Sequence, residues 1–165
     1  MLRHQYVALN PLKRPLICVA MRVKGGLVTL IYRKSLVLSN GEKTTVGPFA
    51  VEAVPMYNLT RGPSAGQLFH DKGRGNGYIL TYGGKRFYFS GDTEAIPEMK
   101  ALKNIDVAFV CMNLPYTMTP EEAAEGVKAF KPKVVYPYHY GMSDLKPFEA
   151  GLKGTGIDVR IRNWY

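Results

Sequence analysis

Two side chains that can bind a metal ion, Asp92 and His139, each follow a segment that is typical of a β-strand. Asp92 stands in the sequence Ser-Gly-Asp-Thr after residues 86–90, and His139 comes directly after residues 133–138. Open α/β sheets carry their chemistry in the loops at the carboxyl ends of the strands. A carboxylate and an imidazole at two such ends are therefore candidates for a metal site.

Each candidate also has a simpler explanation. Asp92 could cap the helix expected over residues 96–102 or form an Asx turn, because short acidic side chains bond readily to the nearby backbone. A lone histidine such as His139 is more often structural than a metal ligand. His70 lies in a long unpatterned loop, and such loops are often functional. His4 lies in an unpatterned N-terminal segment and is not expected to be a ligand.

Other catalytic motifs are absent from the sequence. It contains no Gly-x-Ser-x-Gly nucleophile elbow and no Gly-Lys-Ser/Thr of a phosphate-binding loop. The glycines from Gly73 to Gly77 resemble half of a dinucleotide fingerprint, but a strand follows them where a helix is required, so a turn is expected. Two cysteines, Cys18 and Cys111, are too few for a disulfide framework. Cys111 lies in an apolar strand and is expected to be a buried, inert thiol.

The elements that would position these residues change character along the chain. Strand patterns dominate the first half, whereas strands and helices alternate after Asp92. Thr119 begins one helix as its N-cap, with proline in the first turn and glutamate three residues after the cap. This order predicts an α/β protein with a mixed sheet covered by helices. The expected strands are 27–32, 36–38, 44–46, 49–55, 78–82, 86–90, 106–112, 133–138 and 157–161, with a hairpin turn at 40–41, and the expected helices are 96–102, 120–130 and 144–153.

The positive charge of the chain is concentrated near its N-terminus. The 165 residues carry a formal net charge of +9 and are enough for one domain with a hydrophobic core. Residues 1–41 hold seven basic and no acidic residues, whereas the remainder holds 15 basic and 13 acidic residues. A solvated or poorly ordered segment explains this pattern most simply, and an arm that binds nucleic acid or an anionic membrane is the less favoured alternative.

Targeting signals are weak or missing in the sequence. No apolar run approaches the roughly 18 residues of a membrane-spanning helix. The apolar segment 16–21 follows Pro15 and is too short for a convincing signal peptide. We therefore expect no membrane span and, by default, a cytoplasmic location.

Four segments of the chain carry a likeness to a known family. They are VEAVPMYNLT, FHDKGRGNGYILTYGGKRFYFSGDTE, IDVAFVCMNLPYTMTPEEAAEGVKAFKPKVVYPYHYG and the terminal strand, in that order. Together they resemble the C-terminal half of a metallo-β-lactamase-fold hydrolase, closest to small bacterial zinc-dependent hydrolases of poorly defined substrate. The likeness covers residues 36–165, roughly four fifths of the chain. It implies half of an αββα sandwich, preceded by an irregular basic segment, residues 1–35.

The resemblance implies a dinuclear metal site between two αβ halves. Asp92 would be the carboxylate shared by both metal ions, and His139 the late histidine on the second ion. The family has an earlier histidine after the VEAVP strand, but Tyr57 and Asn58 stand there, and His70 is the candidate to replace it. The implied cofactor is zinc, two ions per complete site, and nitrogen and oxygen ligands also suit manganese or iron.

Three polar side chains near these ligands are candidates for the substrate side of the site. Tyr138 and Tyr140 flank His139 and could donate a hydrogen bond to a developing oxyanion, and Asn58 is the third candidate. The implied reaction is hydrolysis, in which bound metal ions activate a water molecule. The implied partner is a small-molecule substrate whose type does not follow from the fold.

The family's His-x-His-x-Asp-His signature is absent from this chain, which contains three histidines and no such cluster. A catalytic zinc ion takes about three protein ligands, so a pair requires about six. We therefore expect doubtful metal occupancy and little or no hydrolase activity from this chain alone. The acid-free N-terminus is interpreted as that of a truncated or mis-started gene product.

Two other functions fit the same observations. A non-catalytic fragment or interaction module would form a homodimer through the sheet face that the missing half should cover, because large exposed apolar surfaces mark partner sites. An RNA-binding protein would use the basic segment 1–35, and its affinity would fall steeply with salt concentration. The oligomeric state and the salt dependence of binding would distinguish these functions from hydrolysis.

Overall fold

The computed structural model describes residues 21–23, 26–28 and 37–164. The chain divides into two compact units, Met1–Leu38 and Ser39–Tyr165. The second unit begins three residues after the start at residue 36 that the sequence predicts for the half-domain.

The first unit contains a strand pair within the segment for which the sequence predicts irregular structure. β1 (Met21–Val23) pairs antiparallel with β2 (Gly26–Val28). β2 overlaps the start of the strand expected over 27–32. The rest of that strand, Cys18 and most of the basic segment lie outside the described residues.

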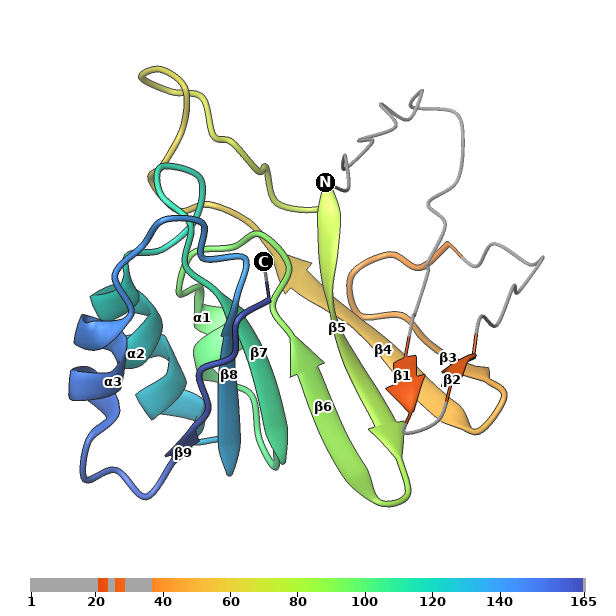
Figure 1. Cartoon of the computed structure of the whole chain (residues 1–165). Coiled ribbons are helices and arrows are strands. Elements are labelled where there is room, and N and C mark those ends of the chain that lie inside the picture. The colour runs from red at the N-terminus through yellow and green to blue at the C-terminus, as the bar shows by residue number, and fades with distance from the viewer. Residues whose placement is uncertain (1–20, 24–25, 29–36, 165) are drawn as a thin grey trace. The chain divides into compact units, whose positions relative to one another are not determined.

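A seven-stranded mixed sheet forms the centre of the second unit (Figure 1). Its strands lie side by side in chain order. Neighbouring strands are antiparallel from the first to the fourth strand of the sheet and parallel from the fourth to the seventh. The predicted α/β class and mixed sheet are therefore confirmed. The strands are β3 (Lys43–Val46), β4 (Phe49–Met56), β5 (Gly75–Tyr82), β6 (Lys85–Phe89), β7 (Val107–Cys111), β8 (Val134–Tyr138) and β9 (Asp158–Val159).

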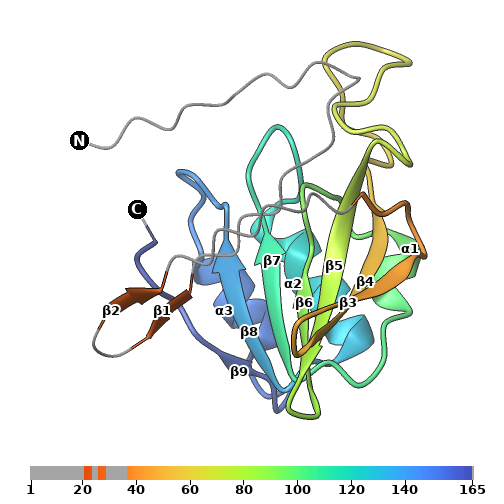
Figure 2. The same cartoon turned by 90° about the vertical axis from the view of Figure 1, so that its right-hand side faces the viewer.

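Three helices, α1 (Pro97–Lys100), α2 (Pro120–Phe130) and α3 (Lys146–Leu152), lie on one face of this sheet (Figures 1 and 2). α2 begins with the predicted cap. The Thr119 hydroxyl accepts a hydrogen bond from the Glu122 backbone N–H, and the Glu122 carboxylate accepts one from the Thr119 N–H. Two backbone donors that a helix start leaves free are thereby satisfied. No helix among the described residues has the length and apolar character needed to cross a membrane.

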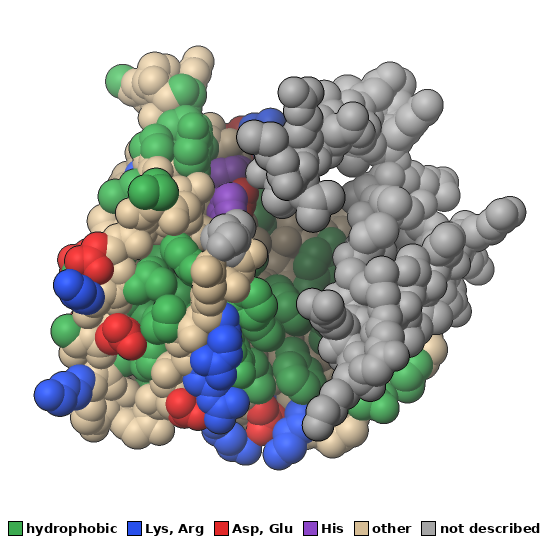
Figure 3. All heavy atoms as spheres, in the orientation of Figure 1, with side chains coloured by type: hydrophobic (Ala, Val, Ile, Leu, Met, Phe, Trp, Pro, Cys, Tyr) green, Lys and Arg blue, Asp and Glu red, His purple; other side chains and the backbone are tan. Residues whose placement is uncertain are grey.

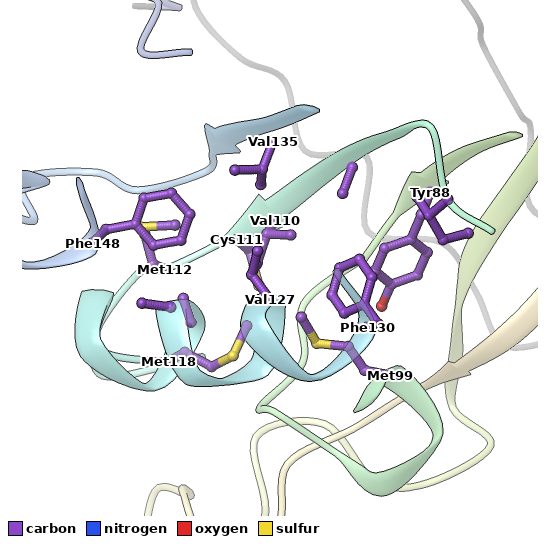
Figure 4. Packing of buried hydrophobic residues seen from close by; sticks show 14 of the residues in the cluster. Tyr88, Met99, Val110, Cys111, Met112, Met118, Val127, Phe130, Val135 and Phe148 are labelled. Atoms are coloured by element: carbon purple, nitrogen blue, oxygen red, sulfur yellow. The ribbon is translucent and has the colours of Figure 1, made fainter. Parts of the chain in front are cut away.

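The hydrophobic core lies between the sheet and the helices (Figure 4). Tyr88 from β6 packs edge-on against Phe130 from α2, with ring centroids 5.7 Å apart. Val127 of α2 and Val110 of β7 are fully buried. Cys111 is fully buried as predicted, and burial raises the pKa of its thiol, which disfavours the reactive thiolate. The core therefore fixes the strands whose ends carry the candidate ligands.

The opposite face of the sheet carries an aromatic ladder, which we define as Phe89, Phe109 and Tyr136 on neighbouring strands β6, β7 and β8. Ring centroids are 4.7 Å apart for Phe89 and Phe109, and 5.2 Å apart for Phe109 and Tyr136. Trp164 lies against the last two rings and is 45% exposed. Within residues 37–164, all helices lie on the other side of the sheet, so no helix there covers this ladder.

The hairpin predicted around Asn40-Gly41 is partly wrong. A turn does form there, because the Glu42 N–H donates to the Ser39 carbonyl and Gly41 has a φ of +88°. Residues 37–39 do not form a strand, however, and β3 pairs with β4 through a turn that contains Gly47. The φ of +55° at Gly47 is readily adopted only by glycine, and this turn sets the register of the pair.

One carboxylate at the amino end of β7 links three segments of the sheet. Asp106 accepts hydrogen bonds from the side chain of Lys133, at 2.7 Å, and from the backbone N–H of Arg86, at 2.9 Å. The Lys133 hydrogen bond, followed by the Arg86 one, lowers the pKa of Asp106 to about 2.

This low pKa predicts a specific acid sensitivity. Between about pH 4 and pH 2 the unfolded chain binds more protons at Asp106 than the folded protein does, so the free energy of unfolding should fall with pH in this range. The Asp106→Asn variant lacks this contribution and should show a shallower fall. Urea unfolding monitored by circular dichroism at several pH values measures both slopes, and equal slopes would contradict the prediction.

Candidate metal centre

The strands β4, β6, β7 and β8 run in the same direction as β9, so their carboxyl ends lie at one edge of the sheet (Figure 1). The loops that follow them are residues 57–74, 90–96, 112–119 and 139–145. The first contains His70, the second Asp92 and the fourth His139. The sheet therefore delivers all three predicted metal ligands to the same edge.

Asp92 lies between the two imidazoles. Its Oδ2 is 3.7 Å from Nε2 of His70, and its Oδ1 is 3.5 Å from Nε2 of His139. The side chains are 41% exposed for Asp92, 21% for His70 and 33% for His139, so the site is open to solvent. Figure 3 shows histidine and acidic side chains together on this part of the surface.

The spacing of these atoms suits metal ligands in pairs. Two ligand atoms about 2.1 Å from a tetrahedral zinc ion are separated by about 3.4 Å, close to the 3.5 Å and 3.7 Å observed. Among residues 37–164, however, no group of three or more His, Cys, Asp or Glu side chains is arranged to hold a metal ion. Within residues 37–164 the structure therefore brings Asp92 to within the spacing of a ligand pair from each histidine, without a group of three ligands.

The loop before Asp92 is held by one buried and one partly buried partner. The backbone N–H of Gly91 donates to the hydroxyl of Tyr138 at 3.0 Å, and the N–H of Asp92 donates to Sδ of Met56 at 3.2 Å. Burial raises the pKa of Tyr138 well above its ordinary value, so the phenol stays protonated. Tyr138, at the end of β8, thus positions the candidate ligand that follows β6.

Replacing Tyr138 by phenylalanine should lower the free energy of unfolding by about 1–3 kcal/mol, because the Gly91 N–H loses its acceptor in a partly buried site. Tyr82→Phe is the matched control, since Tyr82 is 51% exposed and its hydroxyl should contribute little. Urea unfolding of both variants measures the difference. Equal losses in the two variants would mean that the Tyr138 hydroxyl does not support the loop.

His139 has a left-handed backbone conformation with a φ of +47°. This conformation costs a residue other than glycine about 1–3 kcal/mol and persists only where the surroundings enforce it. Gly141, with a φ of +53°, continues the turn, in which a β-carbon at position 141 would lie 2.7 Å from Oδ1 of Asn113. Strain of this kind is concentrated at functional sites, which supports a functional role for His139.

The three predicted substrate-side residues occupy different surroundings. The Tyr138 hydroxyl faces the Gly91 loop, and the Tyr140 hydroxyl donates to the carbonyl of Arg162 at 3.0 Å. Asn58 is 1% exposed and lies behind His70, with its Oδ1 2.8 Å from Nδ1 of that ring. A role for these residues next to a substrate stays a prediction.

Glu94 is a buried carboxylate whose importance was not evident from the sequence. It is 5% exposed and accepts hydrogen bonds from the backbone N–H groups of Arg61 and Thr60 and from the side-chain amide of Asn58. Its carboxylate therefore ties the loop of His70 to the loop of Asp92. The only signal in the sequence is its place two residues after Asp92.

Comparison with known proteins places the chain in a family. Residues 7–139 match the model of the beta-lactamase superfamily domain. A UPF0173 metal-dependent hydrolase of Symbiobacterium thermophilum is 39% identical over 100 residues, which are 54% of this chain and 45% of that protein. The chain spans about half the length of the curated relatives it matches.

Solved structures agree with this match. A metal-dependent hydrolase of Parabacteroides distasonis is 50% identical and superposes with a TM-score of 0.72, over 78% of this chain and 58% of that one. A zinc-dependent hydrolase of the metallo-β-lactamase superfamily from Thermotoga maritima shares the fold at 19% identity, with a TM-score of 0.59 over 76% of this chain and 71% of that one. The chain therefore belongs to the beta-lactamase superfamily and has the sheet and helices of a metallo-β-lactamase fold.

Proposed function

We propose that this chain supplies one side of a dinuclear zinc site, with Asp92 shared by the two ions, His70 on one ion and His139 on the other. The observation that carries the proposal is the direction of the Asp92 oxygens, because Oδ2 faces His70 and Oδ1 faces His139. A carboxylate with one oxygen toward each of two imidazoles has the arrangement of a bridging ligand. Imidazole nitrogen and carboxylate oxygen are ligands that zinc binds readily, which supports the choice of metal.

The activity that this site suits is metal-dependent hydrolysis of a small-molecule substrate. Bound zinc would lower the pKa of a water ligand and polarise the bond under attack. The names of the Symbiobacterium and Parabacteroides relatives support this reaction class. The residues of the chain would hold the zinc ions and orient their ligands. Asp92 and the two histidines supply ligand atoms, and Tyr138 fixes the loop that carries Asp92.

The isolated chain should hydrolyse substrates weakly. Its described residues supply two ligands to each proposed ion, one fewer than the three that a catalytic zinc usually takes. The sequence has one further histidine, His4, and no histidine cluster. We assign residues 36–165 to a half-domain of the fold and residues 1–35 to a separate segment. Strong hydrolysis by the isolated chain that a chelator abolishes would contradict the weak activity proposed for it.

Zinc binding by the isolated chain tests the proposed ligands. The chain is purified without chelators, and its zinc affinity is measured by calorimetry, with bound metal counted by elemental analysis. The double variant Asp92→Ala/His139→Ala should bind zinc more than about 100-fold more weakly, since loss of even an outer hydrogen bond costs 10–100-fold. Asp71→Ala is the matched control, because Asp71 is an exposed acid beside His70. Equal affinities for the double variant and the wild type would overturn the assignment.

A homodimer is a second candidate, and the aromatic ladder is the observation that favours it. Phe89, Phe109 and Tyr136 form a continuous apolar surface on the sheet face opposite the helices, and Trp164 lies at its border. A second copy of the chain could bury this surface by packing sheet against sheet, as β-sandwiches do.

Sedimentation over a range of concentrations tests the homodimer. Trp164 is the only tryptophan of the chain, so its emission should shift to shorter wavelength as the dimer forms. Phe109→Glu places a charge in the middle of the ladder and should shift the protein to monomer, whereas Tyr82→Glu, at an exposed aromatic position, should not. A wild-type protein that stays monomeric at all concentrations would exclude this candidate.

A further inference from the structure

The side-chain amide of Asn58 is fully engaged and cannot rotate without loss. Its Nδ2 donates to Oε1 of Glu94 at 3.2 Å and to the carbonyl of Tyr116 at 2.9 Å. Its Oδ1 accepts from the backbone N–H of His70 at 2.8 Å. A flipped amide would place its oxygen against a carboxylate and a carbonyl, so the hydrogen-bond partners determine the orientation.

This orientation determines which nitrogen of His70 carries the proton. Nδ1 of His70 lies 2.8 Å from Oδ1 of Asn58, and an amide oxygen can only accept a hydrogen bond. Nδ1 must therefore carry the hydrogen. In the neutral ring the other nitrogen, Nε2, then has a free lone pair, and it is this atom that faces Oδ2 of Asp92 at 3.7 Å.

We infer that Asn58 is a positioning residue that holds His70 as the Nδ1–H tautomer and thereby presents Nε2 to a cation beside Asp92. In the neutral ring two acceptor atoms face each other there, an arrangement that a metal ion between them would stabilise. The inference rests on the proposed zinc site for its function, but the tautomer itself is a property of the metal-free protein. Asn58 thus acts behind the ligand, where it is 1% exposed, and not next to the substrate.

Glu94 keeps Asn58 in this orientation. Its Oε1 also accepts from the backbone N–H of Arg61 at 2.8 Å, so its position is set by the loop backbone and not by Asn58 alone. The backbone N–H of Asn58 donates to the carbonyl of His70 at 2.9 Å, which closes a second link between the two residues. Asn58 therefore holds His70 through a backbone hydrogen bond and through a side-chain hydrogen bond to the ring.

The tautomer can be measured directly in the metal-free chain. Nitrogen-15 spectra of labelled histidine, recorded at a pH where the rings are neutral, distinguish a protonated from an unprotonated ring nitrogen. The chain has three histidines, and His70→Gln identifies the signals of His70 by their loss. We expect His70 to be protonated at Nδ1 and unprotonated at Nε2. Protonation at Nε2 would overturn the inference.

Variants at Asn58 test its function. Asn58→Leu removes the acceptor and should lower the zinc affinity 10–100-fold, with the Nδ1–H tautomer no longer dominant. Asn58→Asp keeps an acceptor toward His70, so the tautomer should be retained even though the extra charge beside Glu94 destabilises the protein. Asp71→Ala is again the matched control, since Asp71 is an exposed acid beside His70, and its zinc affinity should be unchanged.

The outcomes separate this inference from the proposed function. A wild-type Nδ1–H tautomer that shifts in Asn58→Leu supports the positioning role even if no zinc binds, in which case the proposed function alone fails. Zinc binding that is the same in Asn58→Leu and the wild type overturns the positioning role, while the proposed zinc site stands.

Discussion

Replacing Glu94 by glutamine is expected to lower the free energy of unfolding by about 1–3 kcal/mol, the loss seen when buried hydrogen-bond donors are left without an acceptor. The carboxylate accepts hydrogen bonds from the backbone of Arg61 and Thr60 and from the side chain of Asn58, and it lies 3.7 Å from the Arg61 guanidinium. A glutamine has one acceptor oxygen in place of two, and its amide N–H groups would face the N–H groups that now donate to Glu94. Because whole domains are stable by only about 5–15 kcal/mol, this loss should be evident.

Glu98→Gln provides the matched control for this experiment. Glu98 has a side chain that is 33% exposed and pairs with Lys72 at 2.6 Å, and such partly exposed pairs contribute about 0–1 kcal/mol. Urea unfolding followed by circular dichroism compares the two variants. A Glu94→Gln protein as stable as Glu98→Gln would show that the buried network does not stabilise the edge of the sheet.

The pH dependence of the Glu94 contribution follows from its surroundings. Burial alone would raise the pKa of Glu94, but the hydrogen bonds from the Arg61 backbone, the Asn58 amide and the Thr60 backbone together lower it below its ordinary value. A carboxylate with a lowered pKa in the folded protein stabilises it above the ordinary pKa. This stabilisation is lost as the pH falls through the lowered value, so Glu94→Gln should flatten the acid limb of the stability profile.

The proximity of Asp92 and His139 at the carboxyl ends of two parallel strands could be predicted from the sequence. The alternation of strand and helix after Asp92 implies parallel neighbours, and parallel strands end at the same edge. Asp92 after β6 and His139 after β8 therefore had to lie close together. Their observed contact, 3.5 Å between Oδ1 and Nε2, is the result of that topology.

The position of His70 could not be derived in the same way. It lies in residues 57–74, which have no periodicity and are held by hydrogen bonds between distant residues. The Phe69 N–H donates to the Arg61 carbonyl, and the loop is anchored to Glu94. The anchor is a carboxylate 33 positions after Arg61, so local propensity carries no information about this contact. The same reason explains why the contact between Asn58 and His70 could not be derived from the sequence.

Replacing Gly91 by alanine is expected to lower the free energy of unfolding by about 2–5 kcal/mol. Gly91 has a φ of +65°, which costs a residue with a β-carbon about 1–2 kcal/mol. A β-carbon there would also lie 2.9 Å from the carbonyl oxygen of Asn76 and 2.9 Å from Sδ of Met56, and overpacking of this kind costs about 1–3 kcal/mol. The Asn76 oxygen belongs to the backbone of β5, so it cannot move aside as a side chain would.

Gly83→Ala separates the two contributions to this loss. Gly83 has a φ of +55°, but a β-carbon there would meet nothing within 4 Å, so only the backbone cost should be seen. The Gly91 variant should also lose zinc affinity, because its shifted backbone carries Asp92 away from the N–H to Sδ contact with Met56. Thermal and urea unfolding, with calorimetry for zinc, measure both effects. If Gly91→Ala and Gly83→Ala matched in stability and in zinc affinity, the close approach of β5 to the Asp92 loop would have no part in holding the candidate site.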